Sequence, residues 1–215
     1  MIERFNDSLH ESLLIIQEDF KTIKEIDSNG NISLKIDLPE LIRLDSVHKG
    51  IEEFYKKSND GWELEWYSDK KKGIGGKIKL AETKYLFSEE NYILYDEGDD
   101  EDLKYFRPLD YPTPETYVGF IIKPDVIYKS LYYMSVSNYE LNNLDLDYEG
   151  YTQMAVESRV FNHWQRVLLY YMNGEGIGSV ETETFKTEMP KIFPDWTWEN
   201  FIAKFESLRL SNKNK

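Results

Sequence analysis

The stretch EEFYKKSNDGWELEWYSDKKKGIGGKIKL, residues 52–80, holds the clearest structural signals of the chain. Its first part is helical in composition, and Asn59-Asp60-Gly61 supplies the residue types that end a helix and turn the chain. Trp62 and Trp66 then fall on the same side of an alternating apolar–polar run, which is typical of a half-buried strand. The stretch therefore predicts a helix, a turn and a strand, followed by a second strand after the glycines.

Outward from this stretch, apolar residues recur at steps of three and four, the spacing of an amphipathic helix. This pattern predicts helices at residues 2–24, 39–57, 150–173 and about 195–208. Two polar, glycine-containing segments interrupt the pattern, DSNGN at 27–31 and NGEGIGS at 173–179, and both are predicted to be turns or loops.

Short apolar or alternating runs predict the strands. They lie at residues 32–38, 62–67, 77–80, 91–96, 117–122 and 130–136. The segment DYPTPETY at 110–117 is predicted to be an extended connector, because proline is excluded from central strands. Helices flank a central group of strands, so the sequence predicts an α+β fold with a mostly antiparallel sheet between N-terminal and C-terminal helices.

Composition bounds the class of protein. The chain has 215 residues, 40% of them apolar, which is enough for a real core. It has no cysteine, so disulfides, thiolate catalysis and cysteine-ligated zinc are excluded. The N-terminus has acidic residues and no long apolar run, so a signal peptide is not expected, and no stretch approaches the length of a membrane span. We therefore expect a cytoplasmic protein.

The formal net charge is −14, which argues against a nucleic-acid partner and suits a basic protein partner. Many cytosolic proteins are acidic without such a partner, so both interpretations stay open. Charge is densest in DEGDDED, residues 96–102, which we predict to be a solvated loop. As a docking surface, this loop would contribute Asp96, Glu97, Asp99, Asp100, Glu101 and Asp102, assisted by Glu63 and Glu65 on the solvent side of their strand.

The sequence offers little to support catalysis. Its three histidines, His10, His48 and His163, are each predicted to lie alone within a helix, without the spacing of a metal site. GIGGK at 73–77 and GEGIGS at 174–179 lack the spacing or context of phosphate-binding loops, and they are interpreted as hairpin and connector glycines. DLDYEG at 145–150 has oxygen ligands but not the EF-hand order, so it is interpreted as a polar turn. No catalytic residue, metal or cofactor is predicted.

The chain also has sixteen tyrosines. Tyrosine is enriched at protein-binding surfaces, so the strands around Tyr128, Tyr132 and Tyr133 are a second candidate interface. Most tryptophans fall on apolar faces and are predicted to be core residues.

Two segments carry a family resemblance. VHKGIEEFYKKSNDGWELEW, residues 47–66, resembles the helix–Asn-Gly–strand signature of the SUKH superfamily, also called the Smi/Knr family; the matching residues are Phe54, Tyr55, Asn59, Gly61, Leu64 and Trp66, with Trp62 in the same strand. Asp60 is inserted between Asn and Gly. DYEGYTQMAVESRVFNHWQRVLL, residues 147–169, resembles the terminal helix of a bacterial subgroup through Tyr151, Ser158, Arg159, Phe161, Trp164 and Gln165.

The resemblance implies an α+β domain over residues 1–173 without catalytic residues, and residues 174–215 are then a helical extension packed on the same domain. It also implies an immunity protein that binds and neutralises a toxin of a bacterial polymorphic toxin system. Two alternatives stay open: a regulatory adaptor in another protein complex, and a small-ligand or hydrolytic domain that uses exposed carboxylates. A toxin gene next to the gene for this chain would favour the first interpretation.

Overall fold

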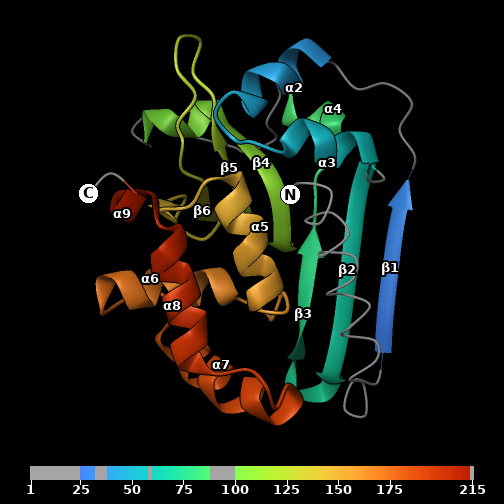
Figure 1. The fold of residues 1–215 in the computed structure, drawn as a ribbon, viewed down its shortest axis with the longest axis vertical. Coiled ribbons are helices and arrows are strands. Elements are labelled where there is room, and N and C mark those ends of the chain that lie inside the picture. Colours follow the sequence, from blue (N-terminus) through green and yellow to red (C-terminus); the bar gives the residue numbers. More distant parts are fainter. Residues whose placement is uncertain (1–24, 32–37, 58–59, 88–99, 214–215) are drawn as a thin grey trace. The chain divides into compact units, whose positions relative to one another are not determined.

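The computed structural model describes residues 25–31, 38–57, 60–87 and 100–213, and the α+β class is confirmed (Figure 1). The strands form two sheets, of order β1-β2-β3 and β4-β5-β6-β7. The strands are β1 (Glu25–Asn31), β2 (Asp60–Asp69), β3 (Ile74–Lys79), β4 (Phe106–Thr113), β5 (Thr116–Ile121), β6 (Tyr132–Ser135) and β7 (Leu141–Asn143). The helices are α2 (Leu38–Asp45), α3 (Ile51–Lys57), α4 (Thr83–Leu86), α5 (Tyr148–Glu157), α6 (Trp164–Asn173), α7 (Ser179–Ile192), α8 (Trp198–Leu208) and α9 (Leu210–Lys213), with short 3-10 helices η1 (Lys70–Lys72) and η2 (Glu101–Tyr105).

The chain divides into two compact units. Of the described residues, the first unit contains 25–28, 64–77 and 150–213, and the second contains 29–31, 38–57, 60–63, 78–87 and 100–149. Residues 174–213 therefore share a unit with residues 150–173, while the domain boundary at residue 173 stays a prediction. In the part of the chain that the structure describes, no helix is long and apolar enough to cross a membrane.

The first unit is organised around Trp66 of β2, which is fully buried. Its indole Nε1–H donates a hydrogen bond of 2.8 Å to the carbonyl oxygen of Arg159, and its ring lies edge-on to Phe161 and Phe193. Gly76 of β3 packs directly on the indole, since a Cβ at this position would lie 2.5 Å from Trp66 Nε1. The predicted core position of Trp66 is confirmed, and the glycine is needed because the strand backbone approaches the ring so closely.

The predicted continuous helix at 150–173 is wrong, because α5 ends at Glu157 and α6 begins at Trp164. Between them Arg159, Val160 and His163 have φ of +53°, +48° and +63°, the left-handed region, in which a helix cannot continue. The freed backbone groups bond β3 instead: Lys77 N donates to the carbonyl of Val160 at 2.7 Å, and Asn162 N donates to the carbonyl of Gly75 at 2.9 Å. Tertiary hydrogen bonds therefore set this break.

The C-terminal helices complete the first unit, and Figure 1 shows α6, α7 and α8 side by side. The predicted helix at 195–208 is confirmed as α8, whose N-cap Thr197 accepts a hydrogen bond from Asn200 N. Helix α7 was not predicted from the sequence, although Thr182, Phe185, Met189 and Ile192 are buried at helical spacing. The ring of Phe185 contacts those of Phe161, Trp196 and Phe201 at 5.3, 5.0 and 4.9 Å between centroids, which joins α7 to the core.

Three further predictions need correction. The predicted turn at 27–31 lies in strand β1, where pairing with β2 overrides the local preference of Asn29-Gly30. The predicted helix at 39–57 is two helices, since Gly50 takes φ +92° and donates to Asp45 Oδ1 at 2.7 Å. The predicted connector at 110–117 is the β4–β5 hairpin. Its prolines are accommodated because Pro112 lies in the register shift between Asp110 and Thr113, and Pro114 lies in the turn between the two strands.

Other predictions are confirmed. The strands predicted at 62–67, 77–80, 117–122 and 130–136 are confirmed as β2, β3, β5 and β6, with ends that differ by one to three residues. Of the residues that resemble the SUKH motifs, Phe54, Tyr55, Leu64, Trp66, Tyr151, Ser158, Phe161, Trp164 and Gln165 are buried, while Trp62 and Arg159 are half-buried. Gly61 takes φ +74°, as its place after a helix predicts. Some predictions fall outside the described residues, namely those for Asn59, the helix at 2–24 and the strands at 32–38 and 91–96. Leu38, the last residue of the predicted strand at 32–38, is described and begins α2.

Replacing Trp66 with alanine is expected to lower the free energy of unfolding by about 3–5 kcal/mol, because it opens a cavity and leaves the Arg159 carbonyl without its indole donor. Denaturant titration followed by circular dichroism measures this loss. Trp198→Ala is the control, since Trp198 is half-exposed in the same unit, and its effect should be clearly smaller. A loss below about 1 kcal/mol for Trp66→Ala would contradict the central position of this residue.

Candidate functional site

The candidate site lies on one face of the sheet β4-β5-β6-β7 in the second unit. Register places Tyr117 opposite Met134, and Met134 opposite Leu141, so these side chains share a face. Phe106 and Ile121 pair on the same face. Four residues there are fully buried, Leu103, Phe106, Ile121 and Met134, and they carry a layer of partly buried side chains, Tyr105, Tyr117, Tyr128, Tyr132, Tyr139 and Leu141. We call these five tyrosines with Leu141 the tyrosine patch.

The opposite face of the sheet belongs to the core of the unit. Val118, Phe120 and Tyr133 are at most 2% exposed there, and Val118 and Tyr133 are register partners. The predicted grouping of Tyr133 with Tyr128 and Tyr132 as an interface is therefore wrong, because successive residues of β6 point to opposite faces. The near-continuous apolar sequences of β5 and β6 have this cause: both faces of these strands are covered by apolar contacts.

The acidic segment joins the patch through η2. Asp100 is the N-cap of this short helix, and its Oδ1 accepts a hydrogen bond from Asp102 N at 2.9 Å. One turn further, Leu103 enters the buried cluster and Tyr105 enters the patch. Of the predicted docking carboxylates, Asp100, Glu101 and Asp102 are thus brought to the patch, with Asp100 and Glu101 exposed. Asp96, Glu97 and Asp99 lie outside the described residues.

Glu63 and Glu65 have different surroundings. Both lie half-buried on β2, where Glu63 pairs with Lys79 at 3.8 Å and Glu65 pairs with Lys77 at 3.5 Å. Glu65 also accepts a hydrogen bond from the hydroxyl of Tyr67 at 2.8 Å. Lys79 and Lys77 offset the negative charge with which the two glutamates were expected to attract a partner protein. The candidate interface therefore consists of Asp100–Asp102 and the tyrosines.

Lys123 links the carboxylates to the rings, and the sequence analysis missed it. Its Nζ lies 2.5 Å from Asp102 Oδ1, 5.4 Å from the ring centroid of Tyr128 and 5.8 Å from that of Tyr105. Hydrogen bonds to Asp102 and Tyr128 raise the pKa of Lys123, so it is a cation throughout the neutral range. Nothing local predicts this contact, because Asp102 and Lys123 are brought together by the folding of β4 and β5 between them.

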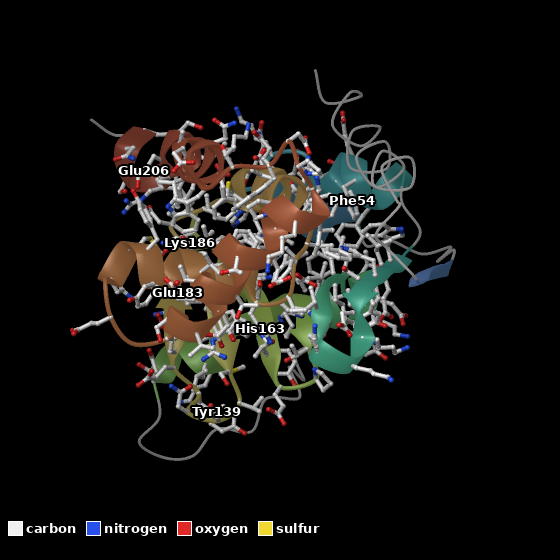
Figure 2. All side chains as sticks on the ribbon, turned by 90° about the horizontal axis from the view of Figure 1, so that it is seen from below. Phe54, Tyr139, His163, Glu183, Lys186 and Glu206 are labelled. Carbon is white, nitrogen blue, oxygen red and sulfur yellow. The ribbon has the colours of Figure 1, made fainter. Side chains whose placement is uncertain are left out.

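The remaining tyrosines extend the patch. Tyr132 lies edge-on to Tyr128, with centroids 6.2 Å apart, and Tyr117 lies edge-on to Tyr111 at 5.4 Å. Burial, with the charges of Asp102 and Asp100 nearby, raises the pKa of Tyr132. Tyr139, labelled in Figure 2, lies in the loop between β6 and β7 and has φ +53°. The rings of Tyr105, Tyr117, Tyr128 and Tyr132 therefore each lie beside a charged side chain or another ring.

His48 holds the patch from behind. The sequence predicted it within a helix, but it lies in the loop between α2 and α3, where it is fully buried. Its Nδ1 accepts from Tyr148 N and its Nε2 donates to the Tyr128 carbonyl, both at 3.1 Å, while its ring lies edge-on to Phe120. This arrangement needs the neutral ring. Burial lowers the pKa of His48 to about 4, with a smaller opposing effect from the charge of Asp147.

The other predicted sites have structural roles. His163 precedes α6 at the N-cap position, without a side-chain bond to the helix. Of the predicted turn at 145–150, residues 145–147 lead into α5, and Asp145 N donates to Asn143 Oδ1, whereas residues 148–150 are the first turn of α5 itself. Among the described residues, no group of three or more histidine, aspartate and glutamate side chains is placed to hold a metal ion.

The stability of the protein is expected to fall below pH 6.5 through His48. Its pKa is 6.5 when unfolded and about 4 when folded, so between these values the unfolded chain binds more protons and stability rises with pH. The loss from pH 6.5 to 4 is about 3 kcal/mol, from about 1.4 kcal/mol per pKa unit.

Unfolding free energies of the native protein and His48→Gln, measured from pH 4 to 8, test this effect. Glutamine keeps a donor and an acceptor without a titrating ring, and carboxylates common to both proteins cancel in the difference. The native protein should lose its advantage over the variant as the pH falls to 4. Two parallel curves would contradict the assignment.

Comparison of the chain with family models, with curated proteins and with solved structures gives no match. The resemblance to the SUKH superfamily therefore stays a prediction that rests on the two sequence segments.

Proposed function

We propose that this chain is a non-catalytic protein-binding module of the SUKH type, an immunity protein that binds and neutralises the cognate toxin of a bacterial polymorphic toxin system in the cytoplasm. The observation that carries the proposal is the tyrosine patch, where half-buried rings on a rigid sheet stand beside Asp100, Glu101 and Asp102. Tyrosine offers a partner a large contact area and a polar hydroxyl, and it is enriched among the residues that dominate binding.

The electrostatics of the chain supports a basic partner. The net charge of −14 attracts a cationic protein over the range of a Debye length, about 8 Å at physiological salt. The family that this chain resembles includes immunity proteins whose toxins are nucleases, and a nuclease presents a basic cleft to its substrate. Asp100, Glu101 and Asp102 form an acidic rim beside the aromatic rings of the patch. This acidic rim would place complementary negative charge in such a cleft.

The residues that match the family motifs stabilise the fold and do not form the proposed binding surface. Trp66, Tyr151 and Trp164 are buried and hold the fold together, so they leave recognition to other residues.

A toxicity-rescue assay tests the proposal. The gene next to the one for this chain is expressed alone and together with it; the neighbour alone should arrest growth, and co-expression should restore it. The variant Tyr132→Ala/Tyr139→Ala should lose most of the rescue at equal protein level. Tyr171→Ala is the matched control, since Tyr171 is an exposed tyrosine of α6 in the first unit. Arrest despite the native chain, or full rescue by the double variant, would contradict the proposal.

The acidic rim should act on the rate of association. With the toxin as partner, Asp100→Asn/Glu101→Gln/Asp102→Asn is expected to slow binding several-fold at low salt, with a smaller effect on dissociation, and the difference should shrink as salt is added. Stopped-flow or surface-based kinetics measure both rates. The control Glu175→Gln/Glu183→Gln/Glu199→Gln removes the same charge from exposed residues of the first unit, including Glu183 on α7 in Figure 2. Equal slowing by both variants would mean that only net charge matters.

A further inference from the structure

The rings of Tyr105 and Tyr128 with the carboxylate of Asp102 form a small cation site in which the chain's own Lys123 is bound. A cation over the face of an aromatic ring is attracted by the ring quadrupole, and a carboxylate at the side adds an ion pair. Asp102 and Tyr105 belong to η2, and Tyr128 belongs to the loop between β5 and β6. The fold brings these two segments together.

The site is fixed by its backbone. Lys123 N donates to the Val126 carbonyl, and Ile122 and Ile127 form an antiparallel bridge, so the loop that carries Lys123 is closed at its base. Tyr128 follows this bridge, and its carbonyl is held by buried His48. Asp102 is oriented by Asp100 through the helix cap. These bonds fix the backbone positions from which the Tyr128 ring and the Asp102 carboxylate project.

The lysine is accessible to solvent. Its side chain is 29% exposed and that of Asp102 is 24% exposed, so water reaches both. Exposed ion pairs and exposed cation–π contacts are each weak. Asp100 and Glu101, both exposed next to Asp102 in the sequence, add negative charge to the same segment.

We propose that the cation site of Tyr105, Tyr128 and Asp102 receives an arginine side chain of the protein partner, which displaces Lys123. Arginine fits better than lysine because its flat guanidinium stacks on tyrosine, presents two parallel donors to a carboxylate and is less strongly hydrated. Lys123 is then an internal competitor that neutralises the site until the partner arrives, and it moves toward Glu101 or solvent when displaced. The inference rests on the proposed protein-binding function for the origin of the arginine.

The site can be tested without the partner. The protein with labelled tyrosine rings is titrated with N-acetyl-arginine methylamide and followed by NMR, with N-acetyl-citrulline methylamide as the uncharged isostere. In Lys123→Met, which keeps the apolar stem but empties the site of its charge, the arginine probe should shift the ring signals of Tyr105 and Tyr128 in a saturable way. A dissociation constant on the order of millimolar is expected for one such contact.

Three comparisons sharpen the result. The native protein should bind the arginine probe several-fold more weakly than Lys123→Met, because its own lysine competes. Adding Asp102→Asn to Lys123→Met should weaken binding, whereas adding Glu183→Gln should not. The ring of Tyr171, an exposed tyrosine of the first unit, should not shift.

Lack of a saturable shift in Lys123→Met, or an equal shift with the citrulline probe, overturns the proposed arginine site. Should the site fail while Tyr132→Ala/Tyr139→Ala still abolishes toxin rescue, the protein-binding function stands and only the chemistry of recognition is wrong. Should the arginine probe bind while no toxin is rescued, the site stands and the proposed function fails.

Discussion

The hydrogen bond from the Trp66 indole to the Arg159 carbonyl is the contact on which the first unit depends. It forms only if the chain after α5 leaves the helix, and Arg159 and Val160 do so in left-handed conformations that cost about 1–2 kcal/mol per residue. The β-branched side chain of Val160 makes this conformation especially unfavourable. Three backbone and indole hydrogen bonds to β2 and β3 offset the cost, and Gly76 lets the strand lie against the ring.

This break directs everything that follows in the chain. It places Phe161 against Trp66 and against Phe185 of α7, and Phe185 in turn contacts Trp196 and Phe201. The indole N–H of Trp196 donates to the Glu157 carbonyl at 3.2 Å, one of the last carbonyls of α5, which α5 itself cannot satisfy. A continuous helix through residues 158–163 would displace Phe161 and so disturb the aromatic contacts through which α7 and α8 pack.

In the second unit, the two faces of the sheet β4-β5-β6-β7 are covered in different ways. The sheet has apolar residues on both faces, but one face is covered by a fully buried core and the other by partly buried tyrosines. Tyrosine tolerates this position because its ring packs on the cluster while its hydroxyl reaches water. His48 connects the two faces, since its ring contacts Phe120 on the core side and its Nε2 holds the backbone of Tyr128 in the patch. A rigid aromatic surface results, and rigidity limits the entropy lost when a partner binds.

The sequence by itself determined the α+β class, the alternating strand around Trp66, the helix end before Gly61 and the burial of Trp66 and Trp164, because periodicity and turn residues report local geometry. It also placed Asp100, Glu101, Asp102, Tyr128 and Tyr132 among the candidate interface residues. Only the tertiary structure decided the break between α5 and α6, the strand through Asn29-Gly30 and the pairing of Asp102 with Lys123. These features depend on partners distant in the chain, 93 residues away for Trp66 and Arg159, and no local pattern encodes such a contact. The side of the sheet that each tyrosine occupies was likewise fixed by strand register, which depends on the neighbouring strand rather than on the residue itself.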